Sequence, residues 1–591
     1  MVIDPDFYLQ RARKFSAEAA VLEGAVRQLA LSRLALAIVL AALIYLGWVD
    51  AMFFFAIPVG VVLFFYLVKR QSKKEAERAI LLQLVRLNEW EAAAGRHDFG
   101  NFPDGARFAD PHHPFSHDLD IFGHCSLFQY LNRCATGLGE QQLADNLTQL
   151  DRSEASILLR QEALRELGPM IAFRQRCWAT GQQIADRNFS ISSLVSWLQQ
   201  PELIQNKKRL FFLRWVLPAL TCIALIGISF FAWLKPVFLV LAVAQLGIAA
   251  VYNKRISRIQ SELSAHRLAL ANFSRLFRLM SAETFHAAEM RQHHQVAHRA
   301  TGHLQEFAAL INALESRMNL IARIFGNGLF LYDFHAVHKL ETWRARHSED
   351  VQGWLASLAT WDALLSLSTY HYNHPTYAFG TVSATLSIRG TAVGHPLIPA
   401  GERIANDFDL GNPARLMLVT GANMAGKSTF LRTIGINQVL ALNGAPVCAR
   451  AWSSPAVELR SGMRTADSLQ EHQSYFYAEL HRLQAIMTEL RTGKQMLILL
   501  DEILKGTNST DKQAGSRELI KQLIQHPALV LLATHDISLG DLAAQFPDQI
   551  VNTCFEGTIE AGQLAFDYTL HAGIAQKANA TFLMRKMGII P

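Results

Sequence analysis

The stretch that decides the fold of the C-terminal part runs from residue 416 to residue 432 and reads Leu-Met-Leu-Val-Thr-Gly-Ala-Asn-Met-Ala-Gly-Lys-Ser-Thr-Phe-Leu-Arg. The apolar run 416–419 predicts a buried strand, and the next segment has the spacing G-x-x-x-x-G-K-[ST]. Glycines let the backbone amides turn toward a phosphate group, and the following helix adds its positive end. The pattern predicts a phosphate-binding loop between a strand and a helix, with chance matching as the alternative.

The loop supplies most of the expected binding residues. Lys427 is expected to reach the outer phosphates of ATP, and the Ser428 hydroxyl is expected to ligate Mg²⁺. The predicted nucleotide-binding residues of the loop are Gly421, Ala422, Asn423, Met424, Ala425, Gly426, Lys427, Ser428 and Thr429.

Two further apolar runs predict parallel strands that end in polar residues. The first, 496–500, is followed by Asp501 and Glu502, and the second, 529–533, leads to His535. We expect Asp501 to hold the Mg²⁺ shell and Glu502 to deprotonate the attacking water. His535 is expected to sense the outermost phosphate, although an isolated histidine after a strand is usually structural. Lys427, Glu502 and His535 are therefore the predicted catalytic residues.

The amino-acid sequences of these segments resemble those of the MutS mismatch-repair family. Residues 421–429 are similar to its G-P-N-M-x-G-K-S-T loop, and residues 501–507 to its D-E-I-G-R-G-T element. Shorter likenesses follow the family's order along the chain at residues 126–133, 160–164, 394–396, 406–407 and 474–479. Each helical piece taken alone is only an amphipathic packing face.

The resemblance implies an ATPase that uses ATP and Mg²⁺, works as a homodimer and binds DNA. Two nucleotide domains would hold ATP between them, with Ser474 reaching the outermost phosphate across the dimer. The resemblance and the apolar runs of the sequence together predict a multi-domain fold, α plus α/β. It has a mainly helical MutS-type core and lever region interrupted by two transmembrane helical hairpins, and a C-terminal P-loop (ABC-type) α/β ATPase domain. The predicted boundaries are 1–78 for the N-terminal segment, 79–370 for the core and 371–591 for the ATPase domain.

This sequence departs from the family pattern at several places. Arg403 stands where an aromatic residue would stack on the adenine, and a guanidinium can also stack on a base. The loop at residues 508–511 is one residue longer than the family's. The N-terminal mismatch-reading domain with its F-x-E wedge is not recognisable before residue 80, so direct mismatch reading is not expected.

Four apolar runs predict membrane segments instead, arranged as two hairpins. The first pair is 34–48 and 51–68, and the second is 216–234 and 237–252, with the second turn expected at Lys235 and Pro236. A full span needs about 20 apolar residues, so slight bilayer thinning or re-entry is implied. Buried core helices and a cleaved signal peptide are the alternatives. Because the long flanks are rich in Lys and Arg, we expect a multi-pass protein of a bacterial-type inner membrane with a cytoplasmic ATPase domain.

Composition adds weaker constraints. The net charge is only +6, and much of the basic excess flanks the apolar runs, where it favours anionic lipid rather than DNA. The six cysteines have no C-x-x-C spacing, so free thiols without zinc are expected. Two clusters of polar residues are present. The first allows either a metal site or a role in turns and consists of His112, His113, His117, Asp118, Asp120 and His124. The second is expected to form a solvated face on a helix from about 256 to 320 and consists of His286, His293, His294 and His298.

Three functions remain open from the sequence. The first is a membrane-anchored MutS-like ATPase that acts on DNA or on a DNA-bound partner. The second is a membrane-bound ATP switch that acts on a protein or lipid without DNA. The third is an ABC half-transporter, which predicts six longer spans and an L-S-G-G-Q signature that this sequence lacks. Fold alone does not choose a substrate.

Overall fold

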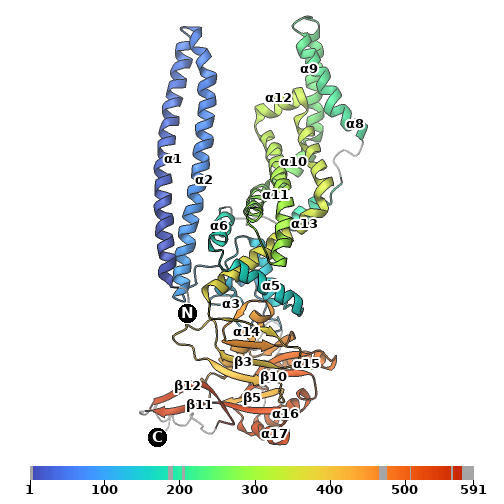
Figure 1. Cartoon of the computed structure of the whole chain (residues 1–591). Coiled ribbons are helices and arrows are strands. Elements are labelled where there is room, and N and C mark those ends of the chain that lie inside the picture. Colours follow the sequence, from blue (N-terminus) through green and yellow to red (C-terminus); the bar gives the residue numbers. More distant parts are fainter. Residues whose placement is uncertain are drawn as a thin grey trace.

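The computed structural model describes residues 4–183, 191–201, 207–464, 475–505, 508–560 and 563–575. Helices occupy the described chain up to Asn373, and an α/β part begins at Ala378. This order confirms the coarse fold prediction of a mainly helical part followed by a C-terminal α/β part. Two helical arms rise side by side from a central helical body, and the α/β part lies at the opposite end of that body (Figure 1).

The first arm is an antiparallel pair of long helices. They are α1 (Pro5–Gly47) and α2 (Ile57–Gly95), joined through the 3-10 segment η1 (Ala51–Ala56). Asp50 starts this segment, since its carboxylate accepts a hydrogen bond from the Met52 amide. A Cβ atom on Gly60 would approach Leu40 Cδ2 to 2.5 Å, so glycine permits the close approach of the two helices. The predicted turn at residues 49 and 50 is confirmed.

The body packs the lower half of α2 and several short helices around α13 (Tyr332–Asn373). These short elements are η2 (Ala106–Phe108), α3 (Leu127–Leu131), α4 (Gly137–Thr148), α5 (Glu154–Leu167), α6 (Ile171–Gly181) and α7 (Ile191–Leu198). The buried Asp362 carboxylate of α13 accepts hydrogen bonds from the Ala135 amide and from the amide and hydroxyl of Thr136. Because Thr136 caps α4, this cluster fixes α4 against α13.

The second arm is built from the middle of the chain. Its elements are α8 (Lys207–Phe211), the π-helical segment η3 (Phe212–Val216), α9 (Leu217–Gly227), α10 (Leu234–Ser281), α11 (Ala288–Glu315), η4 (Ser316–Met318), α12 (Leu320–Phe330) and the first half of α13. The turn between α9 and α10 falls at residues 228–233, so its prediction at Lys235 and Pro236 is wrong. Both residues lie in the first turn of α10, where proline is well tolerated.

The predicted single helix from about 256 to 320 is also wrong, because α10 ends at Ser281 and α11 begins at Ala288. The Glu166 carboxylate of α5 accepts hydrogen bonds from the amides of His286 and Ala287 and so holds the segment just before α11. The solvated-face interpretation fails for His293, whose ring bonds to the Ser357 hydroxyl at 2.8 Å. Burial lowers the pKa of His293 to about 4, whereas His298 is exposed.

The α/β part contains a six-stranded sheet in the order β12-β11-β5-β10-β9-β8. These strands are β5 (Leu416–Gly421), β8 (Glu458–Gly462), β9 (Met496–Asp501), β10 (Ala528–Thr534), β11 (Ile550–Glu560) and β12 (Gln563–Ala572). All neighbouring pairs are parallel except β11 with β12. The three predicted strands are therefore confirmed as the adjacent strands β5, β10 and β9.

Helices and smaller sheets complete this part. The helical elements are α14 (Lys427–Leu442), α15 (Tyr475–Arg491), α16 (Ser509–Leu523), η5 (Ile537–Gly540) and α17 (Asp541–Gln545). A four-stranded sheet has the order β2-β7-β3-β4, with β2 (Thr381–Val382), β3 (Ile388–Val393), β4 (Asn406–Leu410) and β7 (Ala451–Ser454). The pair β1 (Ala378–Phe379) and β6 (Pro446–Val447) lies beside it.

Candidate nucleotide site

Three loops meet at the carboxyl edge of the large sheet. Because β10 lies between β5 and β9, the residues that follow these parallel strands are brought to one place. The residues after β5 and β9 border a cavity of about 540 Å³. Its lining includes Asn423, Met424, Gly426, Lys427, Ser428 and Thr429 of the loop after β5, together with Asp501 and Glu502 after β9.

The backbone of the loop requires glycine at both ends. Gly421 has φ +152° and Gly426 has φ +103°, and both values lie in the region that side chains rarely adopt. A Cβ atom on Gly421 would also approach the carbonyl oxygen of Phe555 in β11 to 2.6 Å. The loop therefore packs directly on the sheet and delivers the chain into α14 at Lys427.

The Lys427 ammonium is held over the loop. Nζ donates hydrogen bonds to the carbonyl oxygens of Gly421 and Ala422, both at 2.8 Å. Burial lowers the pKa of Lys427, and the negative charges of Glu502 and Asp501 oppose that change. The cation is thus partly desolvated and faces the cavity, where an anionic ligand would be strongly attracted.

Glu502 and His535 form a pair at the same edge. His535 Nδ1 lies 3.0 Å from Glu502 Oε1, which fits an N–H donated to the carboxylate. Glu502 has φ +53°, and its amide donates to the Ala533 carbonyl oxygen in β10. Burial raises the pKa of Glu502, but the hydrogen bond from His535 and the charges of His535, Lys505 and Lys427 outweigh it and lower the pKa. Glu502 is therefore an ionised carboxylate, suited to accept a proton.

Sequence comparisons agree with this geometry. The family model for MutS domain V matches residues 417–589. The DNA mismatch repair protein MutS of Thermotoga neapolitana is 30% identical over 282 residues, which is 47% of this chain and 33% of that protein. The Thermotoga maritima protein of that name is 28% identical over 296 residues, 49% of this chain and 35% of its own length. The α/β part, which contains residues 417–589, is therefore similar to MutS-family proteins and is called the MutS-type domain. The match spans about a third of the length of these curated relatives.

The MutS-type domain places one predicted residue away from the cavity. The Arg403 guanidinium donates to the Tyr377 hydroxyl at 2.8 Å and lies against Gly394 rather than in the lining of the cavity. The next residue, Ile404, lines the cavity instead and is 48% exposed. Ser474 and the Gly506–Thr507 pair lie outside the described residues. Asn508, in the lengthened loop, caps α16 by accepting a hydrogen bond from the Asp511 amide.

The MutS-type domain also contains cavity residues that the sequence did not single out. Tyr568 of β12 faces Gly426, and Ile398 and Glu402 line the side opposite the loop. Asn406, quoted above only as part of a motif, donates to the Tyr568 carbonyl oxygen and accepts from the Leu570 amide. This exchange ties β4 to β12. The Asn406-Asp407 pair gave a signal in the sequence, as did His395 of the 394–396 segment, which also lines the cavity; Tyr568 gave none.

The loop from His112 to His124, for which a metal site was one alternative, joins the MutS-type domain to the helical body. Within the described ranges, no group of three or more His, Cys, Asp and Glu side chains is arranged to hold a metal ion. Asp118 is fully buried and accepts hydrogen bonds from the Ser461 hydroxyl and the Arg464 amide. It also pairs with Arg482 of α15 at 2.8 Å, while Asp120 pairs with Arg464 at 2.6 Å.

Asp118→Asn is expected to weaken this junction. The substitution leaves Arg482 without its buried carboxylate, and breaking such a pair costs about 3 kcal/mol. For a domain of this size, that loss corresponds to a fall in melting temperature of roughly 6–12 °C, measured by circular dichroism in detergent. The control is Asp110→Asn in the same loop, because Asp110 is exposed and bonds only locally to the His112 amide. Equal melting of the two variants would show that Asp118 does not hold the junction.

Proposed function

We propose that this chain is a membrane-anchored MutS-family ATPase whose ATP state controls the pairing of two copies and acts on DNA or on a DNA-bound partner. The observation that carries the proposal is the meeting of Lys427, Asp501 and Glu502 around one cavity. Such a set can bind a triphosphate, hold its metal and activate water. Both relatives are DNA mismatch repair proteins MutS, which supports DNA as the partner.

Each residue has a defined part in the proposed reaction. The loop amides and the Lys427 ammonium bind the phosphates, and Glu502 accepts the proton of the attacking water. Ser428 and Asp501 offer the hard oxygen donors that Mg²⁺ prefers, and the metal would neutralise phosphate charge. His535 keeps the Glu502 carboxylate ionised and oriented through its hydrogen bond. In this proposal Ser474 of a second copy completes the site, so a homodimer is the working unit.

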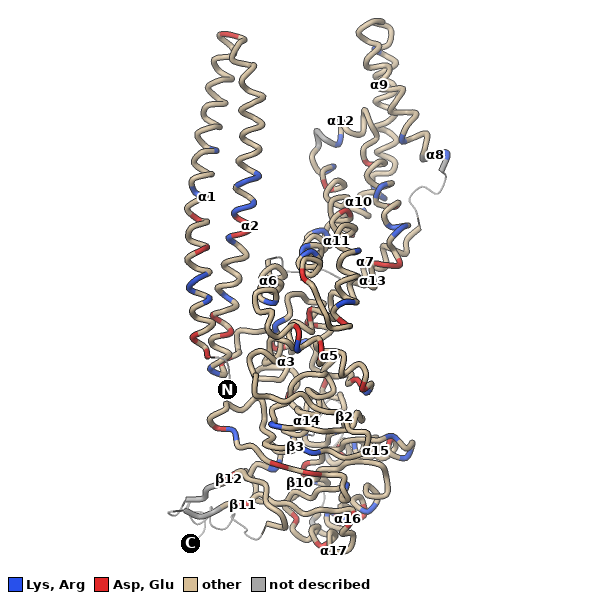
Figure 2. Tube along the Cα trace, in the orientation of Figure 1, with Lys and Arg blue, Asp and Glu red and all other residues tan. Residues whose placement is uncertain are grey.

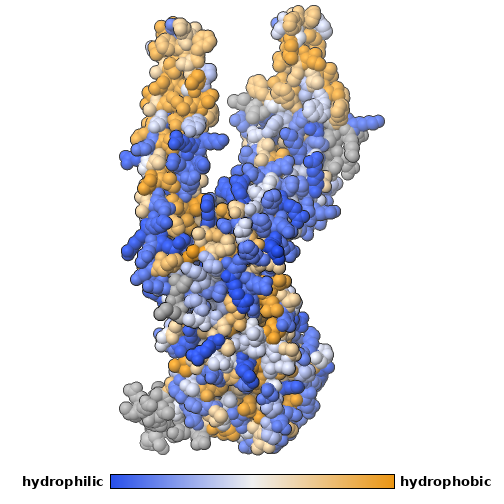
Figure 3. Space-filling model, viewed as in Figure 1, coloured by the Kyte–Doolittle hydropathy of each residue, from blue (hydrophilic) through white to orange (hydrophobic). Residues whose placement is uncertain are grey.

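Membrane anchoring rests on the two arms. Within the part of the chain that the structure describes, three helices are long and apolar enough to cross a membrane: α1, α10 and the helical stretch Ala51–Gly95. Phe212–Gly227 is a shorter apolar helix. The apolar ends of both arms point the same way, away from the α/β part (Figure 3). Charged residues are almost confined to the lower parts of the arms (Figure 2). By the positive-inside rule, this arrangement supports a cytoplasmic MutS-type domain at a bacterial-type inner membrane.

The deciding experiment measures ATP hydrolysis by the detergent-solubilised protein with homoduplex, mismatched or branched DNA across a salt series. Stimulation that fades as salt rises is expected, because contacts to phosphates release counterions. Lys427→Ala protein, prepared in parallel, reports any contaminating ATPase. Hydrolysis that DNA does not change, together with no DNA retention at low salt, would favour the second candidate, an ATP switch acting on a protein or lipid. That candidate is supported by the apolar arms.

A further inference from the structure

Helix α12 carries an apolar face that the body of the protein does not cover. Ile324 is 44% exposed, Phe325 is 64% exposed and Phe330 is 51% exposed. Arg323 is the one charged residue in this helix. These three large apolar side chains project in different directions around a helix of 11 residues, and their exposure to water is unfavourable. This segment lies in the predicted helical core and lever region, outside the four predicted apolar runs.

The position of α12 along the second arm shows what this face meets. Gly328 lies against Leu246, whose side chain would be 3.7 Å from a Cβ atom at that glycine. Leu246 belongs to the apolar run of α10, which ends at Tyr252 before the cations Lys254 and Arg255. Leu246 is six positions before Tyr252 in α10. At a rise of 1.5 Å per residue, the contact between Gly328 and Leu246 therefore lies about 9 Å beyond Tyr252, within the apolar part of α10. Interfacial helices bury their apolar faces to a depth of about 5–10 Å.

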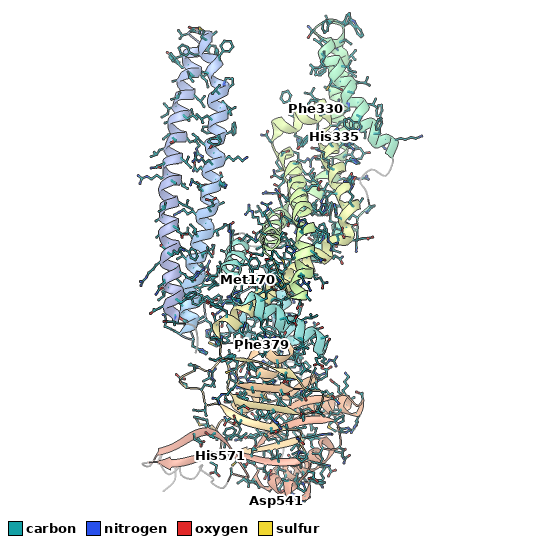
Figure 4. The ribbon with its side chains drawn as sticks, in the orientation of Figure 1. Met170, Phe330, His335, Phe379, Asp541 and His571 are labelled. Atoms are coloured by element: carbon teal, nitrogen blue, oxygen red, sulfur yellow. The ribbon has the colours of Figure 1, made fainter. Side chains whose placement is uncertain are left out.

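A belt of aromatic and basic side chains surrounds the second arm near this level. On α8 and η3, Phe211 is 61% exposed and Trp215 is 55% exposed. The Arg209 guanidinium lies 5.9 Å from the centre of the Tyr252 ring. Aromatic residues beside Lys and Arg are typical of the boundary between acyl chains and headgroups. Figure 4 labels Phe330 and His335 at this boundary, where α12 turns into α13.

Buried polar contacts fix α12 at this depth. Arg317, just before α12, pairs with Asp333 of α13 at 3.0 Å and donates to Asn253 of α10 at 2.6 Å. The Asp333 amide donates to the Asn327 side chain at 3.0 Å, which secures the other end of α12. The helix is therefore attached to α10 and α13 at both ends and cannot turn its apolar face inward without breaking these buried bonds.

We propose that α12 is an interfacial membrane helix, whose Ile324, Phe325 and Phe330 side chains insert among the acyl chains of the cytoplasmic leaflet. This inference rests on the proposed membrane anchoring and adds a lipid contact inside the helical core region. The occupant is lipid rather than protein, because the face continues the apolar surface of α9 and α10. Helix α13 then connects this lipid contact to the MutS-type domain without interruption, since it runs from Tyr332 to Asn373.

The test places an environment-sensitive fluorophore (NBD) on single cysteines in the full chain. The background carries Cys125→Ser and Cys222→Ala, since the other four cysteines are buried. The labelled variants are Phe325→Cys, with Ile324→Cys as a second site on α12, Val243→Cys in the apolar run of α10, and Glu306→Cys on the exposed side of α11. Each is reconstituted in phosphatidylcholine vesicles with a minority of phosphatidylglycerol and quenched by nitroxide lipids or by aqueous iodide.

The α12 labels are expected to be quenched by shallow nitroxide lipids several-fold more than the Glu306 label and to be protected from iodide. The Val243 label should respond to deeper nitroxides. If iodide reaches the α12 labels while lipid quenches the Val243 label, the inference fails and membrane anchoring stands. If lipid quenches none of them, the anchoring fails as well. Shielding of the α12 labels from both quenchers would mean that a protein surface covers α12, which also overturns the lipid assignment.

Discussion

Protein carrying Glu502→Gln is expected to bind ATP as the unmodified chain does and to hydrolyse it roughly 100-fold or more slowly. Glutamine keeps the shape of the side chain and can still contact His535, but it cannot accept a proton from water. Binding should survive because the phosphates are held by the loop and Lys427 rather than by Glu502. The expected signature is retention of radiolabelled ATP on the purified protein with loss of phosphate release.

The matched control for this prediction is Glu402→Gln. Glu402 also lines the cavity, but it lies on the segment before β4 rather than at the carboxyl end of β9. Its substitution removes the same charge and should leave hydrolysis within a few-fold of the unmodified rate. Unchanged hydrolysis by the Glu502→Gln protein would show that another group acts as the base. Equal losses of hydrolysis in the two variants would show that the negative charge of the cavity matters, rather than a base at Glu502.

The pH profile offers an independent check on the same carboxylate. Glu502 acts as a base only when ionised, so activity is lost as pH falls through its pKa, which the structure holds below the usual glutamate value. His535→Ala removes the hydrogen bond that lowers this pKa, so burial is opposed less strongly and the pKa rises. The acid limb of kcat/KM is therefore expected to move to higher pH in His535→Ala protein.

Much of the large sheet could be predicted because its central strands are continuous apolar runs. A strand buried on both faces needs no partner to be recognised, and polar residues directly after it mark its end. The parallel order of β5, β10 and β9 then brings Lys427, Asp501 and Glu502 together without further information. For this reason, local sequence patterns are enough to predict that the loop and the acidic pair lie at the same edge of the sheet.

The remaining features of the site depend on contacts between distant segments. Tyr568 reaches the cavity because β12 pairs antiparallel with β11, and no local sequence pattern predicts that pairing. Arg403 and Ile404 are neighbours in sequence, and only the Arg403–Tyr377 hydrogen bond decides which of them faces the cavity. Asp118 looked like part of a metal cluster because its partners, Ser461, Arg464 and Arg482, lie more than 300 residues away in the chain.

The helical part shows the same division between local and long-range information. The apolar runs were recognised from composition, but helix ends depend on capping. Pro236 was interpreted as a turn residue, whereas proline also suits the first turn of a helix, and α10 uses it there. The break between α10 and α11 is stabilised by Glu166 of α5, whose carboxylate accepts hydrogen bonds from the amides of His286 and Ala287. No pattern within residues 256–320 contains that information.

Lys427→Ala should have the largest effect on nucleotide affinity. The ammonium is partly buried and is already positioned over the loop by two carbonyl oxygens, so a bound phosphate meets a pre-organised cation. A hydrogen bond to a charged group contributes about 1.5–3 kcal/mol, which corresponds to a roughly 10- to 150-fold weaker Kd for ATP when it is lost. Titration of a fluorescent ATP analogue in detergent measures this change.

Lys494→Ala is the control for loss of positive charge. Lys494 is exposed in the turn before β9 and does not line the cavity, so its substitution changes the net charge equally without touching the loop. Its Kd should stay within about twofold of the unmodified value, because exposed charges a Debye length away are screened. If the two variants bind ATP equally well, Lys427 does not contact the phosphates and the cavity is not the nucleotide site. A loss confined to Lys427→Ala would instead tie ATP to this loop, independently of any partner at the membrane or on DNA.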